Sequence, residues 1–343
     1  MTLLNRRQFN ALAASAAGLA LPAWAQPTQT VKIGSAVRSI FSLPLYVADQ
    51  KGFFREQGLV ADVSFFSGGP PATAALLGGS VDFVSSAVEN QLKLAKRGQR
   101  VVSIMAMQAD FSGALVLHKS AADKLTARLK HKPGVKDLRG LRIATLARGG
   151  FADMAARYIF ADAGLDPDKD VELIPVRGYD KVLAAAQAGE IDGSLMVEPW
   201  QTIAVEGGKD WEYVVHITLG EGPKVFKDIG YVTLQTTPRL LAENRPLADK
   251  VVTALVKAQR FIAPVGNLDE LVEIAQKVFP SEQPRVLRTS IAKQQASFRP
   301  ALHAEMITKN MELLLKNKAI EGTAPAVADL FDNHFAGLWN KTL

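Results

Sequence analysis

Cysteine is absent from this sequence of 343 residues. Its absence excludes disulfide scaffolds, thiolate metal sites and cysteine nucleophiles. Histidine is also scarce, because the chain has five, and no two of them stand three or four residues apart, the spacing that places two metal ligands on one helical face. No G-x-S-x-G elbow occurs either. We therefore expect no metal, no cofactor and no enzymatic nucleophile.

Aromatic residues make up only 7% of the chain, and its charge is dispersed. The net charge is +6, yet no window contains five consecutive lysines or arginines. A nucleic-acid-binding protein gathers its positive charge into a stripe and interleaves aromatic side chains with it. The sequence therefore argues against nucleic acid as a partner.

Long apolar runs are missing as well, since no later stretch approaches 18 uninterrupted apolar residues. The N-terminus has the three parts of an export signal: Arg6 and Arg7, a short apolar run over 11–21, and the small-x-small site Ala23-Trp24-Ala25. We expect cleavage after residue 25 and a soluble protein in the periplasm. The segment 6–9 resembles a twin-arginine signal, but its flanks depart from that pattern, so the ordinary secretion route stays open.

Short β-rich runs alternate with helical segments along the mature chain. Strands are expected at 31–35, 61–66, 81–85, 101–106, 114–118, 141–146, 171–176, 193–197, 213–217 and 231–236. Helices are expected at 43–50, 71–77, 88–97, 151–163, 179–188 and 199–206, then at 247–261, 268–279, 283–290, 304–316 and 327–335. Residues 120–135 read as a polar connector with a short helix. This rhythm predicts an α/β fold with largely parallel sheets and a helical C-terminal region.

One motif occurs twice. A helix ends at a glycine, one polar residue and one β-branched residue follow, and an aspartate begins a strand: Gly79-Ser80-Val81-Asp82 and Gly189-Glu190-Ile191-Asp192. The glycine suits a left-handed helix end, and we expect the aspartate to bond backbone amides at the turn into the strand. The repetition predicts two similar lobes with a cleft between them.

Several segments resemble one family. Pro44-Leu45-Tyr46-Val47-Ala48, Lys51-Gly52-Phe53-Phe54 and Gln57-Gly58-Leu59 are similar to the opening signature of the substrate-binding components of nitrate, sulfonate and taurine importers. The stretches 79–83 and 137–144 and the triplet Glu198-Pro199-Trp200 match later parts of its pattern in order and spacing. The resemblance covers 31–208 strongly.

This resemblance implies a type II periplasmic binding fold, with two α/β lobes joined by two crossover strands as a hinge near 114–118 and 231–236. We expect one lobe to combine 26–116 with 233–343 and the other to span 117–232. The implied partners are a small-molecule solute and the permease of an ABC importer, and we expect a monomer. Enzymes with related architectures depend on cysteine, which this chain lacks. Two rival interpretations remain: a secreted enzyme that uses a water nucleophile, and a sensory module that presents the ligand to a receptor.

Ligands of open α/β sheets lie beyond the carboxyl ends of the strands, so the loops there supply the candidate site. The candidates are Ser35, Arg38, Ser39, Ser85, Ser86, Asn90, Arg148, Gly149, Gly150, Phe151, Arg177, Tyr179, Glu198 and Trp200. The serines also suit capping of their own helices, and the arginines also suit solvated loops.

These residue types favour an anion. Helix starts present free amides, glycines allow close approach, and guanidinium groups match a sulfonate or carboxylate, with Arg148 as the first choice. Arginines on both lobes also suit an aromatic dicarboxylate, and Phe41, Phe151, Tyr179 and Trp200 could stack on its ring. Glu198 indicates the alternative, an amine or a pyrimidine-type solute.

Overall fold

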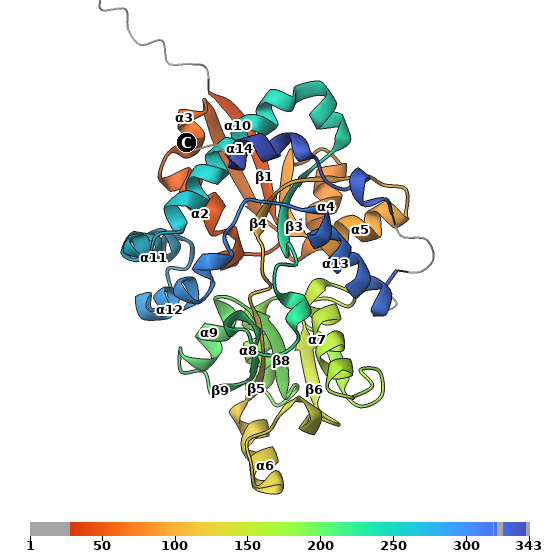
Figure 1. Cartoon of the computed structure of the whole chain (residues 1–343). Coiled ribbons are helices and arrows are strands. Elements are labelled where there is room, and N and C mark those ends of the chain that lie inside the picture. The colour runs from red at the N-terminus through yellow and green to blue at the C-terminus, as the bar shows by residue number, and fades with distance from the viewer. Residues whose placement is uncertain (1–27, 318, 321–324, 341–343) are drawn as a thin grey trace, which may run out of the picture.

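Two five-stranded sheets organise the chain (Figure 1). The computed structural model describes residues 28–317, 319–320 and 325–340, so the expected export signal lies outside the described residues. The first sheet has the order β2-β1-β3-β10-β4, and the second has the order β7-β6-β8-β5-β9. The strands are β1 Gln29–Ser35, β2 Leu59–Phe65, β3 Phe83–Ala87, β4 Val102–Gln108, β5 Gly113–His118, β6 Arg142–Thr145, β7 Glu172–Pro175, β8 Gly193–Val197, β9 Trp211–His216 and β10 Val232–Thr236.

Each sheet contains four parallel strands and one antiparallel strand. In the first sheet β10 runs antiparallel to β3 and β4, and in the second β5 runs antiparallel to β8 and β9. The antiparallel strand is in each case the one that enters directly from the other sheet. The prediction of largely parallel sheets in two similar halves is confirmed, and we call them, with the helices beside them, the first and second lobes.

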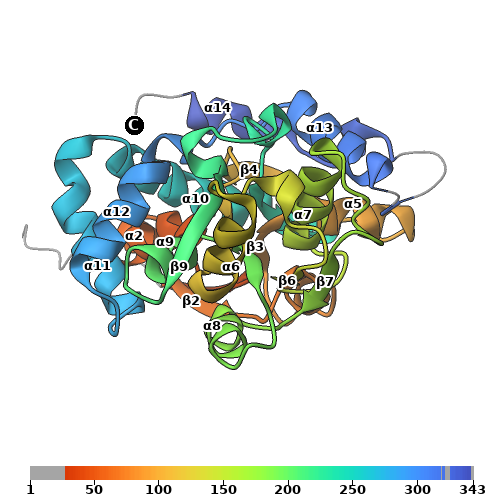
Figure 2. The ribbon, with the colours of Figure 1, turned by 90° about the horizontal axis from the view of Figure 1, so that it is seen from below.

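Helices cover both sheets (Figures 1 and 2). The first lobe has α2 Leu43–Gln50, α3 Phe53–Glu56, α4 Gly69–Leu77 and α5 Val88–Lys96, and the second has α6 Lys119–Leu129, α7 Phe151–Asp162, α8 Tyr179–Gln187 and α9 Trp200–Val205. The C-terminal helices are α10 Pro238–Ile262, α11 Leu268–Val278, α12 Pro284–Gln294, α13 Ala304–Lys316 and α14 Ala336–Trp339. Within the described ranges, no helix has the length and apolar character that crossing a membrane requires.

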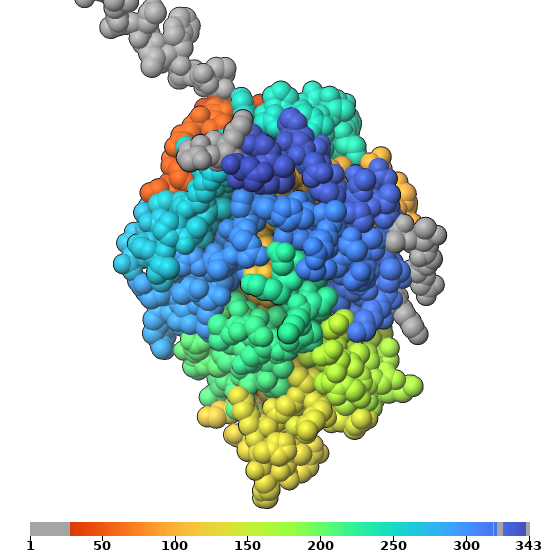
Figure 3. All heavy atoms as spheres, viewed as in Figure 1, coloured from red at the N-terminus to blue at the C-terminus, as the bar shows by residue number. Residues whose placement is uncertain are grey.

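The C-terminal helices touch both lobes. α10 packs against α2 and α3 of the first lobe, whereas α12 contacts α9 and α13 contacts α7 of the second. Figure 3 shows these blue segments lying over the first lobe and meeting the green second lobe. They therefore add to the contact between the lobes.

The helix expected at 327–335 is wrong. That segment contains only two short 3-10 turns, Val327–Asp329 and Asn333–Phe335. Between them Phe331 forms a β-bridge with Ser103, whose amide donates to the carbonyl of Leu330. Pairing with β4 therefore overrides the apolar spacing that suggested a helix.

The first C-terminal helix begins earlier than its expected start at 247. α10 begins at Pro238 and is interrupted at Asn244, where φ is −151° and ψ is 57°. Pro246 cannot donate a backbone hydrogen bond, and the Asn244 side chain instead accepts one from the amide of Leu247. The expected start at 247 thus marks the point where the helix resumes after the kink.

The predicted lobe boundaries at 116/117 and 232/233 fall inside strands. β5 pairs wholly within the second sheet and β10 wholly within the first. We propose that the crossings are residues 109–112 and 217–231, and that these segments, rather than the strands, form the hinge. The crossings run side by side, because the Phe111 amide donates to the Phe226 carbonyl at 3.0 Å and the Gly230 amide donates to the Ala109 carbonyl at 2.8 Å.

Asp110 fastens the two crossings together. Its Oδ1 accepts from the Asp228 amide at 2.7 Å, and its Oδ2 accepts from Lys227 at 2.8 Å and from Ser297 at 2.7 Å. Burial alone would raise the pKa of Asp110, but these donors outweigh burial and hold the pKa below its ordinary value. A charged carboxylate therefore joins both crossings to the C-terminal region.

The repeated aspartate motif forms the predicted contact in both lobes. Asp82 accepts a hydrogen bond from the Lys32 amide at 2.8 Å, and Asp192 accepts one from the Arg142 amide at 2.9 Å. Only the second lobe adds a side-chain pair, because Arg142 donates to both carboxylate oxygens of Asp192, at 3.0 and 2.9 Å. Burial opposes ionisation of Asp192, yet the hydrogen bonds from Arg142 place its pKa below the ordinary value.

Replacing Asp192 with alanine should lower the free energy of unfolding by about 1–3 kcal/mol, because charge-assisted hydrogen bonds are lost. Asp82→Ala is the matched control and should cost less, since it removes no side-chain pair. The contribution of Asp192 is present above its unfolded pKa of about 4 and is lost as pH falls through the lower folded value. Denaturant unfolding at pH 7 and pH 3 measures this. Equal losses for the two variants at pH 7 would contradict the interpretation.

Candidate functional site

A cavity lies between the lobes, at the carboxyl ends of the parallel strands. Its lining from the first lobe includes Ala36, Val37, Phe41, Gly68, Gly69, Pro70, Ser86, Ala87, Glu89 and Asn90. The second lobe supplies Leu146, Ala147, Gly150, Phe151, Ala152, Tyr179 and Val197, and the second crossing and β10 supply Tyr231 and Val232. The free space is about 70 Å³, which holds a few water molecules and is well below a typical ligand pocket.

Direct contacts between the lobes explain why the space is small. The Ser39 hydroxyl donates to the Glu198 carbonyl at 2.6 Å, and Trp200 Nε1 donates to the Arg38 carbonyl at 3.4 Å. Elsewhere Lys93 of α5 donates to the carbonyl of Gly149, in the loop before α7. The lobes are therefore closed on each other around the cavity.

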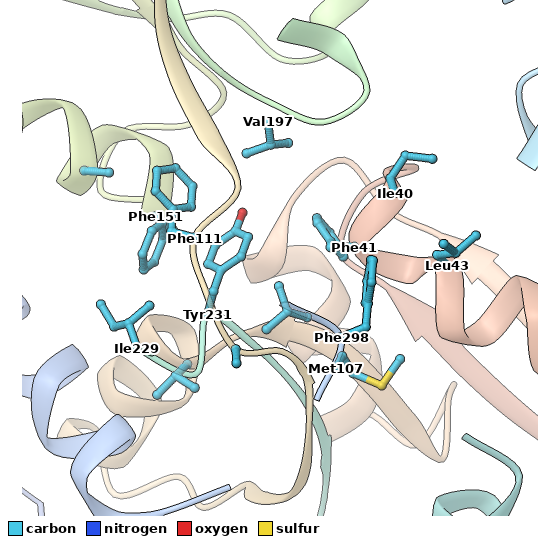
Figure 4. Close-up of a cluster of buried hydrophobic side chains, with 14 of the residues drawn as sticks. Ile40, Phe41, Leu43, Met107, Phe111, Phe151, Val197, Ile229, Tyr231 and Phe298 are labelled. Atoms are coloured by element: carbon cyan, nitrogen blue, oxygen red, sulfur yellow. The ribbon is translucent and has the colours of Figure 1, made fainter. Parts of the chain in front are cut away.

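Phe41, Phe151 and Tyr231 line the cavity, and Figure 4 shows them packed in one cluster with Phe111. Tyr231 lies between Phe41 and the pair Phe111 and Phe151, with ring centroids 6.1 Å from Phe41, 4.9 Å from Phe111 and 4.6 Å from Phe151. These rings come from the first lobe, both crossings and the start of α7. A flat or apolar part of a ligand would thus meet ring surfaces contributed by each part of the molecule.

Gly69 allows α4 to begin close to the cavity. A Cβ atom at this position would lie 2.0 Å from Nδ2 of Asn90, a distance that no real pair of atoms adopts. Any larger residue would therefore displace Asn90, whose Nδ2 also donates to Glu89 at 2.7 Å and to Ser86 at 3.4 Å. The glycine keeps this polar group in place.

Glu89 is the acidic side chain among the residues that line the cavity, and it is 2% exposed. Its Oε1 accepts from Asn90, but its Oε2 has no hydrogen-bond partner among the described residues. Burial raises the pKa of Glu89, and the nearby charge of Lys93 and backbone amides, including that of Phe151, oppose this only in part. A carboxyl group with one unsatisfied oxygen therefore lines the cavity.

Tyr179 brings a second unsatisfied polar atom. Its ring is buried against Trp200, with centroids 5.8 Å apart, and its hydroxyl has no partner among the described residues. Burial raises the pKa of Tyr179 above its ordinary value, and the backbone of Val197 beside the hydroxyl opposes this only in part, so the hydroxyl stays protonated and can donate. Native proteins seldom leave buried polar atoms unpaired, which points to water or a ligand as the missing partner.

Five of the predicted site residues line this cavity: Ser86, Asn90, Gly150, Phe151 and Tyr179. The predicted arginines do not. Arg38 and Arg177 are exposed outside the cavity, whereas Arg148 and Gly149 line a neighbouring one.

Other predicted residues serve packing or closure rather than the cavity wall. Ser35 bonds to the Ser42 hydroxyl at 2.6 Å, and Ser85 is buried without lining the cavity. Ser39 and Trp200 form the contacts between the lobes described above. The carboxyl group of Glu198 points away into α9, where Oε1 accepts from Gln201 at 2.8 Å and Thr202 at 3.0 Å, and burial raises its pKa.

Sequence reasoning missed Glu89 and Tyr231. Glu89 directly precedes the predicted Asn90, in the first turn of a helix that follows a run of small residues, and this position could have identified it. Tyr231 was assigned to a hinge strand rather than to the site. No group of three or more histidine, aspartate or glutamate side chains suited to a metal ion occurs in the part of the chain that the structure describes.

Comparisons with known proteins agree on one family and one fold. A model of the NMT1-like family matches residues 25–276. The putative binding protein YtlA of Bacillus subtilis is 26% identical over 273 residues, which cover 79% of this chain and 77% of YtlA.

Two solved structures share the fold at lower identity. The alkanesulfonate-binding protein SsuA from Xanthomonas axonopodis, bound to MOPS, has a TM-score of 0.73 at 16% identity, covering 88% of this chain and 98% of SsuA. The periplasmic nitrate-binding protein NrtA from Synechocystis has a TM-score of 0.73 at 16% identity, covering 90% of this chain and 88% of NrtA. The predicted two-lobed periplasmic binding fold is therefore confirmed.

These relatives and structural neighbours are binding proteins, which agrees with the sequence prediction that the chain is not an enzyme. The family model extends over well more than half of the chain and spans both lobes. The chain belongs to the NMT1-like family and has the two-lobed periplasmic binding fold.

Proposed function

We propose that this protein is the solute-binding component of an ABC importer. We propose that its solute is a small molecule with an amine attached to a flat ring, which binds in the cavity between the lobes. A protein from Staphylococcus aureus described as the ligand-binding component of an ABC-type import system shares the fold with a TM-score of 0.73, and this supports the importer role. SsuA and NrtA, named as binding proteins for alkanesulfonate and nitrate, support the binding of a small solute. We further propose that the protein acts in the periplasm, after export directed by residues 1–25, and delivers its solute to a membrane permease as a monomer.

The observation that carries the choice of solute is the unsatisfied carboxyl oxygen of Glu89. A buried acceptor without a partner is costly, and an ammonium or ring N–H group would supply a charge-assisted hydrogen bond. No lysine or arginine occurs among the described residues that line the cavity. The rings of Phe41, Phe151 and Tyr231 suit a flat cation, because aromatic faces attract positive charge.

An organic anion such as a sulfonate or carboxylate is the second candidate, and the helix N-termini favour it. α5 and α7 both begin at the cavity and direct free amides toward it. However, Glu89 stands in the first turn of α5 and lines the same cavity. An anion beside it would require Glu89 to be protonated, so we favour the amine.

Capture requires the lobes to separate, because in the closed state the contacts between them surround the cavity. Opening would break the contacts of Ser39 and Lys93 with the opposite lobe and bend the chain at the two crossings. A solute that touches both Glu89 and Phe151 binds only when the lobes are together, so its binding energy stabilises the closed state.

Glu89→Gln should weaken the binding of benzylamine by about tenfold to a hundredfold, the equivalent of one charge-assisted hydrogen bond. Benzoate, which has the same ring and the opposite charge, should not bind more weakly to this variant. Glu190→Gln, at an exposed position in the second lobe, is the matched control and should bind like the unmodified protein. Isothermal titration calorimetry measures all three. Unchanged benzylamine affinity in Glu89→Gln would refute the amine proposal.

The affinity for benzylamine should also fall as pH decreases, and it should fall at a pH above the ordinary glutamate range. The amine needs the charged carboxylate, and burial raises the pKa at which Glu89 loses its charge. The Glu89→Gln variant should show no such fall. A pH profile in the unmodified protein that is flat between pH 7 and pH 4 would contradict the assignment.

Without a solute, Glu89→Gln should stabilise the protein at neutral pH. A carboxyl group whose folded pKa is raised costs stability once pH exceeds its unfolded pKa of about 4.5, because the unfolded chain ionises there while burial opposes ionisation in the folded protein; the loss is complete above the folded pKa. We expect the midpoint of thermal unfolding to rise by about 1–2 °C at pH 7.5, equivalent to about 1 kcal/mol, and to differ little at pH 4. Differential scanning calorimetry measures this, and a lower midpoint at pH 7.5 would contradict it.

A further inference from the structure

A second, more open cavity adjoins the one between the lobes. It has a volume of about 760 Å³ and shares Pro70 and Asn90 with the first cavity, so the two meet at these residues. Its walls are α4 and α5 of the first lobe and the loop before α7 of the second. It therefore also spans the two lobes.

Among the described residues that line this second cavity, every charged side chain is basic. Lys93, Lys96, Arg97 and Arg148 line it, and no acidic side chain occurs among the described residues of its lining. Arg97 and Arg148 form no ion pair with any described residue, whereas Arg142 and Arg157 are paired with aspartates. The first cavity has the opposite character, with a carboxyl group and no cationic side chain among its described lining.

Lys93 connects the two cavities. It is half-buried on α5, it donates to the Gly149 carbonyl across the lobes, and its charge acts on the Glu89 carboxyl group. An acidic pocket and a basic pocket therefore lie side by side, with Pro70 and Asn90 in the lining of both. A solute with a positive and a negative group could satisfy both.

We infer that the basic cavity binds an oxyanion group, such as a carboxylate, sulfonate or phosphate, on the same solute whose amine Glu89 holds. This inference rests on the proposed function and narrows its substrate class to molecules that carry an amine and an anionic group. The guanidinium groups of Arg97 and Arg148 match two oxygens of such a group. Because both arginines are exposed, water screens the attraction, and the gain in affinity is modest and sensitive to salt.

The test compares benzylamine with 4-(aminomethyl)benzoate, which carries a carboxylate at the opposite end of the ring. Calorimetry should show that the unmodified protein binds the bifunctional probe about three- to thirtyfold more tightly, as expected for a few screened charge contacts. The double variant Arg97→Ala/Arg148→Ala should lose this advantage and still bind benzylamine normally. The double variant Arg55→Ala/Arg128→Ala, which removes two exposed arginines outside both cavities, should keep it.

The outcomes separate this inference from the proposed function. If benzylamine binds in a Glu89-dependent way but the carboxylate adds nothing, the inference is wrong and the amine proposal stands. An advantage that persists in Arg97→Ala/Arg148→Ala would also overturn the inference. If neither probe binds the unmodified protein, both proposals fail. An advantage that depends on the two arginines and disappears in 1 M sodium chloride supports the inference.

Discussion

The chain passes twice between the lobes, and each time the first strand after the crossing joins the sheet of the lobe that it enters. The rest of the structure depends on this exchange of strands. β5 and β10 are the antiparallel strands, and the crossings that lead into them run side by side. Asp110, in the first crossing, accepts hydrogen bonds from the Asp228 amide of the second crossing and from Ser297 of the C-terminal region. The exchange sets the carboxyl ends of both sets of parallel strands opposite each other. It therefore determines where a cavity can form and which loops line it.

Within that cavity, the carboxyl group of Glu89 is the basis for the solute that we propose. Glu89 stands in the first turn of α5, close to amides that would otherwise attract an anionic solute, and Lys93 lies one helical turn further along. Helix N-termini usually favour anions. Here the Glu89 carboxyl group stands at that position, and its unpaired oxygen favours a hydrogen-bond donor instead. Burial raises the pKa of Glu89. Under the proposed function, the same burial would make Glu89 selective for a donor and would lower the stability of the protein when no solute is bound.

The fold could be predicted because its determinants are local. The glycine-aspartate motif, alternation of strands and helices, and small residues at helix starts are all readable along the chain, and the contacts of Asp82 and Asp192 followed from them. The site could be predicted only as a set of loops. Strand ends indicate which loops meet, but they do not indicate which way each side chain points. The structure shows that Arg38 and Arg177 are exposed and that Glu198 points into α9. For the same reason Glu89, which lines the cavity, was missed. At Phe331, long-range pairing with β4 overrode the local pattern.

A crystal structure of the protein with benzylamine bound tests the central claim most directly. If Glu89 holds the solute, the ligand nitrogen should lie within about 2.7–3.2 Å of Oε2, with the ring between aromatic side chains of the two lobes and the lobes closed. A structure in which the nitrogen points to solvent, or in which water alone occupies the position at Oε2, would contradict this account.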